Sequence, residues 1–196
     1  MRKKKKVVVT GGAGFIGSHL AEELVRQGYH TVILDNLSTG NLENIKPLLK
    51  KENVEFVQES ISNLSLLQKL FQGVEYVFHQ AAISSVPRSI DDPLLSHENN
   101  ATGTLNVLRA ASVNGVKKVI YASSSSIYGD TPTLPKRENM KPNPQSPYAV
   151  AKLMGEYYCR VFQTVYGLST VCLRYFNVYG PRQDPFSEYA AVIPRF

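Results

Sequence analysis

The stretch from Val7 to Gly17 reads VVVTGGAGFIG and decides the fold of this chain. Four strand-forming residues lead directly into glycines at positions 11, 14 and 17, and a helix-like segment follows over residues 15–27. This spacing, between a strand and a helix, is typical of a loop that binds a dinucleotide. The first glycine permits a tight turn, the second lets the main chain approach a pyrophosphate, and the third lets helix and strand pack closely. The amino terminus of the helix would then offer N–H donors to the phosphates.

An acidic residue follows at the distance that this kind of site requires. Asp35 stands eighteen residues after Gly17, at the end of a second predicted strand over residues 31–34. A carboxylate there can bind the hydroxyls of the adenosine ribose and would repel a 2′-phosphate. The sequence therefore predicts NAD, rather than NADP, as the cofactor.

Short apolar runs alternate with longer helix-like segments along the chain, which is the pattern of strand–helix–strand units. A proline-rich stretch over residues 132–144 is expected to be a loop. Right-handed crossovers give a doubly wound parallel sheet, so we predict one α/β domain of the Rossmann type over residues 1–196. The expected strands cover residues 7–10, 31–34, 54–57, 74–79, 116–122 and 170–173, and the expected helices cover residues 15–27, 64–71, 93–114 and 147–166.

Composition excludes several classes of function. The net charge is +6, but five of the 22 basic residues lie in the run Arg2 to Lys6, which is typical of a solvated tail, so we expect no nucleic-acid partner. The apolar runs are too short for a membrane span, and no membrane partner is expected. Two cysteines, Cys159 and Cys172, make neither a disulfide framework nor a metal site. We expect a cytoplasmic protein.

Tyr148 and Lys152 are four residues apart and share one face of the helix expected to begin near Ser146. A tyrosine that acts as a base at neutral pH needs its pKa lowered by ~3 from the ordinary value of about 10. A nearby ammonium, a cationic nicotinamide ring and a helix amino terminus all favour the phenolate. Downstream of a dinucleotide loop, this pair is a candidate for proton transfer.

Four serines, Ser123 to Ser126, directly follow the fifth predicted strand. Ligands bind at the carboxyl ends of strands in open α/β sheets. A serine hydroxyl both donates and accepts hydrogen bonds, so it can relay a proton between a sugar hydroxyl and a phenolate.

These motifs together resemble the NAD-dependent nucleotide-sugar epimerase branch of the extended short-chain dehydrogenase/reductase family. The similarity covers nearly the whole chain and is closest to the UDP-glucose and UDP-N-acetylglucosamine 4-epimerases of that branch. Beyond the glycine loop it rests on LDNLSTG (34–40), HQAA (79–82), SSVPRS (84–89), NATGT (100–104), SSSSIYG (123–129), SPYA (146–149) with Lys152, LRYFN (173–177) and YAAVIP (189–194).

The resemblance implies epimerisation at C4 of a UDP-hexose, either UDP-glucose and UDP-galactose or their N-acetyl forms, through a 4-keto intermediate. It implies that Tyr148 is the base, that Lys152 holds the nicotinamide ribose and tunes Tyr148, and that Ser124 binds the sugar 4-hydroxyl. The implied substrate site comprises Ser85, Ser124, Ser125, Ser126, Tyr148, Asn177, Ala191 and Val192. The implied NAD site comprises Gly11, Gly12, Gly14, Phe15, Ile16, Gly17, Asp35, Asn36, Leu37, Ser38, Thr39, Gly40, Ser60, Ile61, Gln80, Ala81, Ala82, Ser84, Asn100, Tyr148, Lys152 and Phe176.

Two departures from the family pattern bear on function. Ser60 stands where the family usually has an aspartate that binds the adenine amino group. Family members also continue well past the equivalent of Phe196 into a small domain that closes over the sugar nucleotide. We therefore expect the carboxyl-terminal substrate domain to be largely missing.

Several expectations and alternatives accompany this interpretation. The resemblance implies a homodimer formed through the helices over residues 93–114 and 147–166. The serine stretch contains no acid, which disfavours the reactions of related dehydratases and decarboxylases. One alternative is a truncated, non-catalytic NAD-binding module. Another is a keto-sugar reductase that uses NADPH, against which the charge of Asp35 argues.

Overall fold

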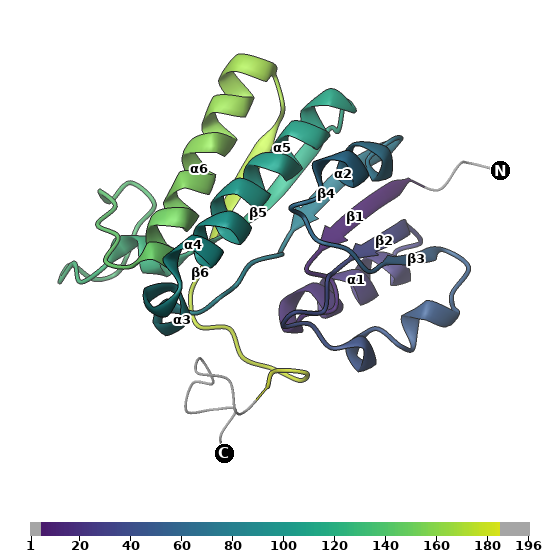
Figure 1. The fold of residues 1–196 in the computed structure, drawn as a ribbon, viewed down its shortest axis with the longest axis horizontal. Coiled ribbons are helices and arrows are strands. Elements are labelled where there is room, and N and C mark those ends of the chain that lie inside the picture. Colours follow the sequence, from purple (N-terminus) through teal and green to yellow (C-terminus); the bar gives the residue numbers. More distant parts are fainter. Residues whose placement is uncertain (1–4, 185–196) are drawn as a thin grey trace.

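The computed structural model describes residues 5–184 and places six parallel strands in one sheet (Figure 1). The sheet order is β3-β2-β1-β4-β5-β6, so the chain builds one half outward from β1 and then returns to build the other half. This order is that of a doubly wound sheet, and the predicted fold class is confirmed. The strands are β1 (Lys6–Thr10), β2 (His30–Leu34), β3 (Val54–Val57), β4 (Val74–His79), β5 (Lys118–Ser124) and β6 (Thr170–Tyr175).

Helices cover both faces of the sheet (Figure 1). One face packs against α1 (Phe15–Arg26), and the other packs against α2 (Leu64–Leu70), α5 (Gly103–Val113) and α6 (Pro147–Tyr166). Within residues 5–184, no helix is long and apolar enough to cross a membrane. The shorter elements are α3 (Val86–Asp91), α4 (Pro93–His97), η1 (Leu42–Asn44), η2 (Leu48–Lys50), η3 (Glu98–Thr102) and η4 (Ser125–Tyr128).

The helix predicted over residues 93–114 is present but is not uniform. A π-helical turn, η3, separates α4 from α5, and the preceding α3 is absent from the sequence prediction. A π turn pairs each N–H with the carbonyl five residues back and so holds an extra residue, which hydrophobic periodicity does not reveal. The strand predicted over 116–122 begins two residues later, at Lys118, and β6 continues to Tyr175.

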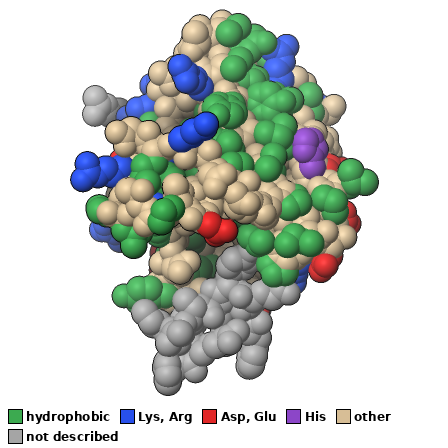
Figure 2. Space-filling view, turned by 90° about the vertical axis from the view of Figure 1, so that its left-hand side faces the viewer, with side chains coloured by type: hydrophobic (Ala, Val, Ile, Leu, Met, Phe, Trp, Pro, Cys, Tyr) green, Lys and Arg blue, Asp and Glu red, His purple; other side chains and the backbone are tan. Residues whose placement is uncertain are grey.

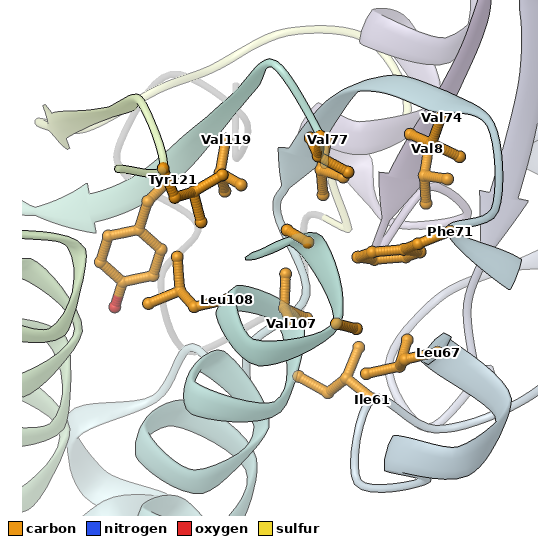
Figure 3. Packing of buried hydrophobic residues seen from close by; sticks show 14 of the residues in the cluster. Val8, Ile61, Leu67, Phe71, Val74, Val77, Val107, Leu108, Val119 and Tyr121 are labelled. Carbon is orange, nitrogen blue, oxygen red and sulfur yellow. The ribbon is translucent and has the colours of Figure 1, made fainter. Parts of the chain in front are cut away.

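The larger core cluster joins the middle of the sheet to the layer that holds α2 and α5 (Figure 3). Val8 and Val77 of adjacent strands face Phe71, next to α2, and Val107 of α5, all four being inaccessible to solvent. Burial of each such side chain contributes about 1.5–3 kcal/mol. The core therefore holds the strand ends, and the loops that follow them, in place.

The start of α6 is set by local sequence. The Ser146 hydroxyl accepts a hydrogen bond from the Ala149 N–H at 3.1 Å, and Pro147 occupies the first helical position. Both features favour a helix that begins at this point. The helix ends at Gly167, whose φ of 69° is the left-handed conformation that glycine adopts readily. Tyr148 and Lys152 are thereby held in the first two turns.

Candidate functional site

A cleft of about 1230 Å³ opens along the carboxyl ends of the strands, where the sheet order reverses. The predicted residues that line it are Gly11, Gly14, Phe15, Ile16, Gly17, Asp35, Asn36, Ser38, Thr39, Ser60, Ile61, Gln80, Ala81, Ala82, Ser84, Ser85, Ser124, Ser125, Ser126, Tyr148, Lys152, Phe176 and Asn177. The cleft thus brings together motifs that lie far apart in the sequence. Four other predicted residues, Gly12, Leu37, Gly40 and Asn100, are not part of the lining, and Ala191 and Val192 lie outside the described residues.

The glycine loop is packed so tightly that side chains are excluded at two of its positions. A Cβ on Gly11, whose φ is +67°, would lie 2.6 Å from the Ala81 nitrogen. A Cβ on Gly17 would lie 2.0 Å from the Gly11 carbonyl oxygen. Gly14, the N-cap of α1, makes no side-chain cap, and the first turn contains no acidic residue. The helix terminus is therefore left open for an anion.

Asp35 connects the glycine loop to the loop that follows β2. Its carboxylate accepts the Ala13 N–H at 2.9 Å and the Leu37 N–H at 2.8 Å. A Cβ on Gly40 would lie 2.7 Å from the Asp35 Oδ1, so glycine lets this loop close over the carboxylate. A carboxylate can accept about four hydrogen bonds, and capacity remains for ribose hydroxyls. Leu37 and Gly40 thus shape the site although neither residue lines the cleft.

Lys152 is a buried cation beside the candidate base. Its Nζ donates to the Ala122 carbonyl at 2.9 Å and lies 5.8 Å from the centre of the Tyr148 ring and 5.2 Å from that of Tyr121. Burial lowers the pKa of Lys152 from 10.5 to about 8, which leaves it mostly protonated at neutral pH. The predicted pair therefore lies on one helix face, with a positive charge beside a half-buried phenol.

The four serines at the end of β5 and the start of η4 have different roles. The Ser124 hydroxyl accepts the Ser126 N–H at 3.1 Å and caps η4. The Ser126 hydroxyl is buried without a protein partner. Ser123 donates to the Glu156 carboxylate of α6 at 2.5 Å. The segment is therefore fixed to α6 at Ser123, while its next three residues line the cleft.

An ion pair supports this serine segment from behind. Arg174 of β6 donates to both oxygens of the Glu156 carboxylate, at 2.9 and 2.8 Å. It also donates to the Tyr128 hydroxyl at 2.9 Å and to the Glu138 carbonyl at 3.0 Å. Both ends of the segment from Ser123 to Tyr128 are thus held by one network, which the sequence prediction missed. The available signal was an arginine inside a strand, where a charged residue needs a partner.

His79 is fully buried at the end of β4. Its Nδ1 lies 2.7 Å from the Thr10 hydroxyl, and its Nε2 lies 3.0 Å from the Thr104 hydroxyl, which itself donates to the Asn100 carbonyl. Burial, and secondarily the charge of Lys152, lowers the pKa of His79 to about 3. The imidazole is therefore neutral and joins β1, β4 and α5.

Asn100, predicted to line the NAD site, is instead buried behind it. Its side chain accepts the Ile83 N–H at 2.9 Å and donates to the Ile83 carbonyl at 3.0 Å. It therefore positions the segment after β4, part of which lines the cleft.

The lining also contains residues outside the predicted NAD and substrate sites. Several directly adjoin predicted residues. Arg182 does not, but its place in the stretch GPRQD (180–184) makes it a candidate for contact with phosphate from the sequence. The lining residues outside the predicted sites are Leu34, Asn41, Asn44, Glu59, Ile83, Val86, Arg88, Asn99, Ala122, Ser123, Tyr175, Val178, Arg182, Gln183 and Asp184.

Comparison with known proteins agrees with this geometry. The family model described as "NAD dependent epimerase/dehydratase family" matches residues 7–196. The chain belongs to this family. The resemblance expected from the sequence is thereby confirmed, and NAD is the cofactor of the family.

Family members with known structures share both fold and sequence with the chain. A UDP-N-acetylglucosamine 4-epimerase from Methanobrevibacter ruminantium, solved with UDP-N-acetylmuramic acid, is 46% identical with a TM-score of 0.92, over 98% of this chain and 61% of that one. A UDP-glucose 4-epimerase from Thermus thermophilus, solved with NAD, is 43% identical with a TM-score of 0.87, over 94% and 59%. A UDP-glucose 4-epimerase from Mycolicibacterium smegmatis is 42% identical, over 95% of this chain and 60% of its own length. The chain thus spans about 60% of the length of these relatives.

The cleft of this family member fits a dinucleotide. The glycine loop leaves an uncapped helix terminus toward the space where a pyrophosphate would lie. The Gln80 side chain lines the cleft and holds a buried Nε2 donor without a protein partner, which suits an acceptor on the cofactor. Ser60 also lines the cleft, and its hydroxyl accepts the Ser62 N–H at 3.1 Å.

Proposed function

We propose that this chain carries the NAD-binding and catalytic residues of a UDP-hexose 4-epimerase that acts on UDP-glucose and UDP-galactose or on their N-acetyl forms. The observation that carries the proposal is the meeting of Ser124, Tyr148 and Lys152 in the cleft that the glycine loop also lines. Support also comes from relatives named as UDP-sugar 4-epimerases that are 42–46% identical to the chain.

The proposed NAD site uses main-chain and side-chain groups in sequence along the cleft. The N–H groups at the start of α1 bind the pyrophosphate, and Asp35 binds the adenosine ribose. Lys152 holds the nicotinamide ribose, and the Gln80 Nε2 donates to the bound cofactor. Ser60 accepts a hydrogen bond from the adenine in place of the aspartate that is usual in the family.

The proposed mechanism uses three side chains for one proton transfer. Tyr148 removes the proton of the sugar 4-hydroxyl, and Ser124 bonds to that hydroxyl and relays the proton. Lys152 supplies a fixed positive charge, and because it is buried its field is only weakly screened. The chemistry that NAD supplies when bound is reversible hydride acceptance at C4 of the sugar. The 4-keto sugar would turn over and take the hydride back on its opposite face, which inverts C4, and Tyr148 then returns the proton to the 4-oxygen, so no NAD is consumed.

The substrate side of the proposed site includes Ser85, Ser125, Ser126 and Asn177. The buried Ser126 hydroxyl, which has no protein partner, suits a hydrogen bond to the sugar nucleotide. Ala191 and Val192 stay predictions from the sequence.

A homodimer is part of the proposal. Exposed apolar side chains lie on α6, including Val161 at 47% and Val165 at 66%, and Leu94 of α4 is 81% exposed. Figure 2, viewed from the side of α6, shows hydrophobic side chains gathered on this face. An apolar helix face of this kind suits a second copy of the chain. A cytoplasmic location stays a prediction.

A coupled assay tests the function. We expect the protein to convert UDP-galactose to UDP-glucose, and Tyr148→Phe to abolish conversion while NAD still binds with wild-type affinity. Undiminished conversion by Tyr148→Phe would refute the assigned base. NAD binding without conversion by the wild-type chain would instead favour the binding-module alternative, which the coverage of about 60% of the relatives' length keeps open. Tighter binding of NADPH than NADH would favour the reductase.

A further inference from the structure

The chain returns from β6 to the outer side of the glycine loop. There the His19 Nε2 donates to the Pro181 carbonyl at 2.8 Å, and Arg182 forms an ion pair with Glu22 of α1. The Arg182 Nη1 also lies 3.4 Å from the Ser18 hydroxyl. Arg182 lines the cleft, so a guanidinium from the last described segment is attached to the helix that begins at the phosphate-binding loop.

The contacts of Arg182 lie on one particular face of α1. Positions 14, 18 and 22 are four residues apart and therefore share a face of the helix. Arg182 contacts the second and third of these positions, and the first is Gly14, the open N-cap. One helical turn is about 5.4 Å, which lies within the reach of a flexible arginine side chain.

The present partner of Arg182 is weakly held. The side chain of Glu22 is 51% exposed and that of Arg182 is 26% exposed, and an ion pair this hydrated contributes only about 0–1 kcal/mol. A pyrophosphate carries more charge than a carboxylate and offers paired oxygens to the guanidinium fork. Exchange of the Glu22 carboxylate for a phosphate oxygen therefore costs Arg182 little free energy.

Other cations that line the described cleft are placed differently. Lys152 is buried and donates to the Ala122 carbonyl, and Arg88 belongs to α3, across the cleft on the side of β4. Arg182 also has a φ of +66°, a conformation that non-glycine residues adopt rarely and that is concentrated at ligand sites. Position, charge and backbone strain thus single out the same residue.

We propose that Arg182 is a second anchor of the dinucleotide pyrophosphate, exchanging Glu22 for a phosphate oxygen when the cofactor binds. The inference rests on the proposed function, because it requires NAD in the cleft. Binding would then draw the segment over residues 178–182 toward the mouth of the glycine loop. Cofactor binding and the position of residues after Asn177, on the substrate side, would thereby be coupled.

Calorimetric titration of the purified protein with NAD, ADP and adenosine tests the anchor. We expect Arg182→Gln to weaken binding of NAD and ADP by roughly tenfold and to leave adenosine, which has no phosphate, unchanged. Arg26→Gln is the matched control, because Arg26 forms an exposed ion pair with Glu23 on the same helix and does not line the cleft. It should bind all three ligands as the wild type does.

A double variant separates direct contact from charge shielding. We expect Glu22→Gln to tighten NAD binding a few-fold, because it removes the competing partner, and Arg182→Gln combined with Glu22→Gln to stay as weak as Arg182→Gln alone. Restoration of affinity in the double variant would overturn the anchor, since Arg182 would then act only by neutralising Glu22. Wild-type affinity in Arg182→Gln would also overturn it. Failure of the wild type itself to bind NAD would instead refute the proposed function.

Discussion

The two halves of the sheet build their parts of the cleft by different means. In the half made of β1, β2 and β3, main-chain groups do most of the work: glycines remove side chains, and free N–H groups face the space. In the half made of β4, β5 and β6, side chains line the site, and long-range polar contacts such as the Glu156–Arg174 pair hold them. The first half thus depends on glycines, which have no side chain, and the second depends on polar side chains that pair with one another.

The largest loss of stability is expected at Gly17, where the backbone of α1 packs directly against the backbone of the glycine loop. Gly17→Ala would place a Cβ 2.0 Å from the Gly11 carbonyl oxygen, and neither backbone can move aside. We expect a loss of more than about 3 kcal/mol in the free energy of unfolding, as for severe overpacking. Urea denaturation measures it. Gly14→Ala is the control, because its Cβ would meet only the Gly11 oxygen, at 3.2 Å, and should cost less than about 1 kcal/mol. Equal losses of unfolding free energy in Gly17→Ala and Gly14→Ala would contradict the predicted difference between these two positions.

The next largest loss of stability is expected in the half made of β4, β5 and β6, at the ion pair of Glu156 and Arg174. Glu156→Gln leaves the Arg174 guanidinium with no compensating charge, and the two side chains are only 12% and 17% exposed. Breaking a buried pair costs about 3 kcal/mol, so we expect a loss near that size in urea denaturation. Glu156→Gln combined with Arg174→Met should recover part of it. Adenosine affinity should stay unchanged, since the proposed adenosine site lies in the other half of the sheet. A large loss of that affinity would show that the two halves are not independent.

Acidification should weaken the contact between the halves. The pKa of His79 is lowered from 6.5 to about 3, first by burial and then by the charge of Lys152, so between these values the unfolded chain binds the proton more readily. This contribution to stability is complete above pH 6.5 and falls as the pH drops, by at most about 1.4 kcal/mol per pH unit. We expect a loss of about 2 kcal/mol between pH 7 and pH 5 in urea denaturation. His79→Gln should reduce this loss, whereas His97→Gln, at an exposed position of α4, should retain it.

The smallest effect concerns one hydroxyl of the serine segment. Ser123→Ala removes the hydrogen bond to Glu156 but leaves its ion pair with Arg174, so we expect a loss of about 1 kcal/mol in denaturation. Ser125→Ala is the matched control in the same denaturation experiment, because Ser125 lines the cleft. It should change the free energy of unfolding less than Ser123→Ala does. A loss above about 2 kcal/mol for Ser123→Ala would mean that this hydroxyl supports the whole network.

The same contrast explains what could be predicted from the sequence. The order of strands and helices and the glycine loop follow from local patterns, because turn chemistry and periodicity act over a few residues. Glu156 and Arg174 are eighteen residues apart, and nothing in their local sequence indicates that they pair. Asn100 belongs to the stretch NATGT, yet its hydrogen bond with Ile83 depends on how the turn η3 joins α4 to α5. Only the three-dimensional fold determines that connection.

The π turn at Glu98–Thr102 sets the rotational phase of the whole connection between α3 and α5. Each α-helical residue turns the chain by about 100°, so a chain one residue shorter there would rotate α4 against α5 by that angle. Asn100 would then release Ile83, or Thr104 would release His79. Single-residue deletions in these five positions should accordingly be far less tolerated than deletions in the proline-rich loop over residues 132–144.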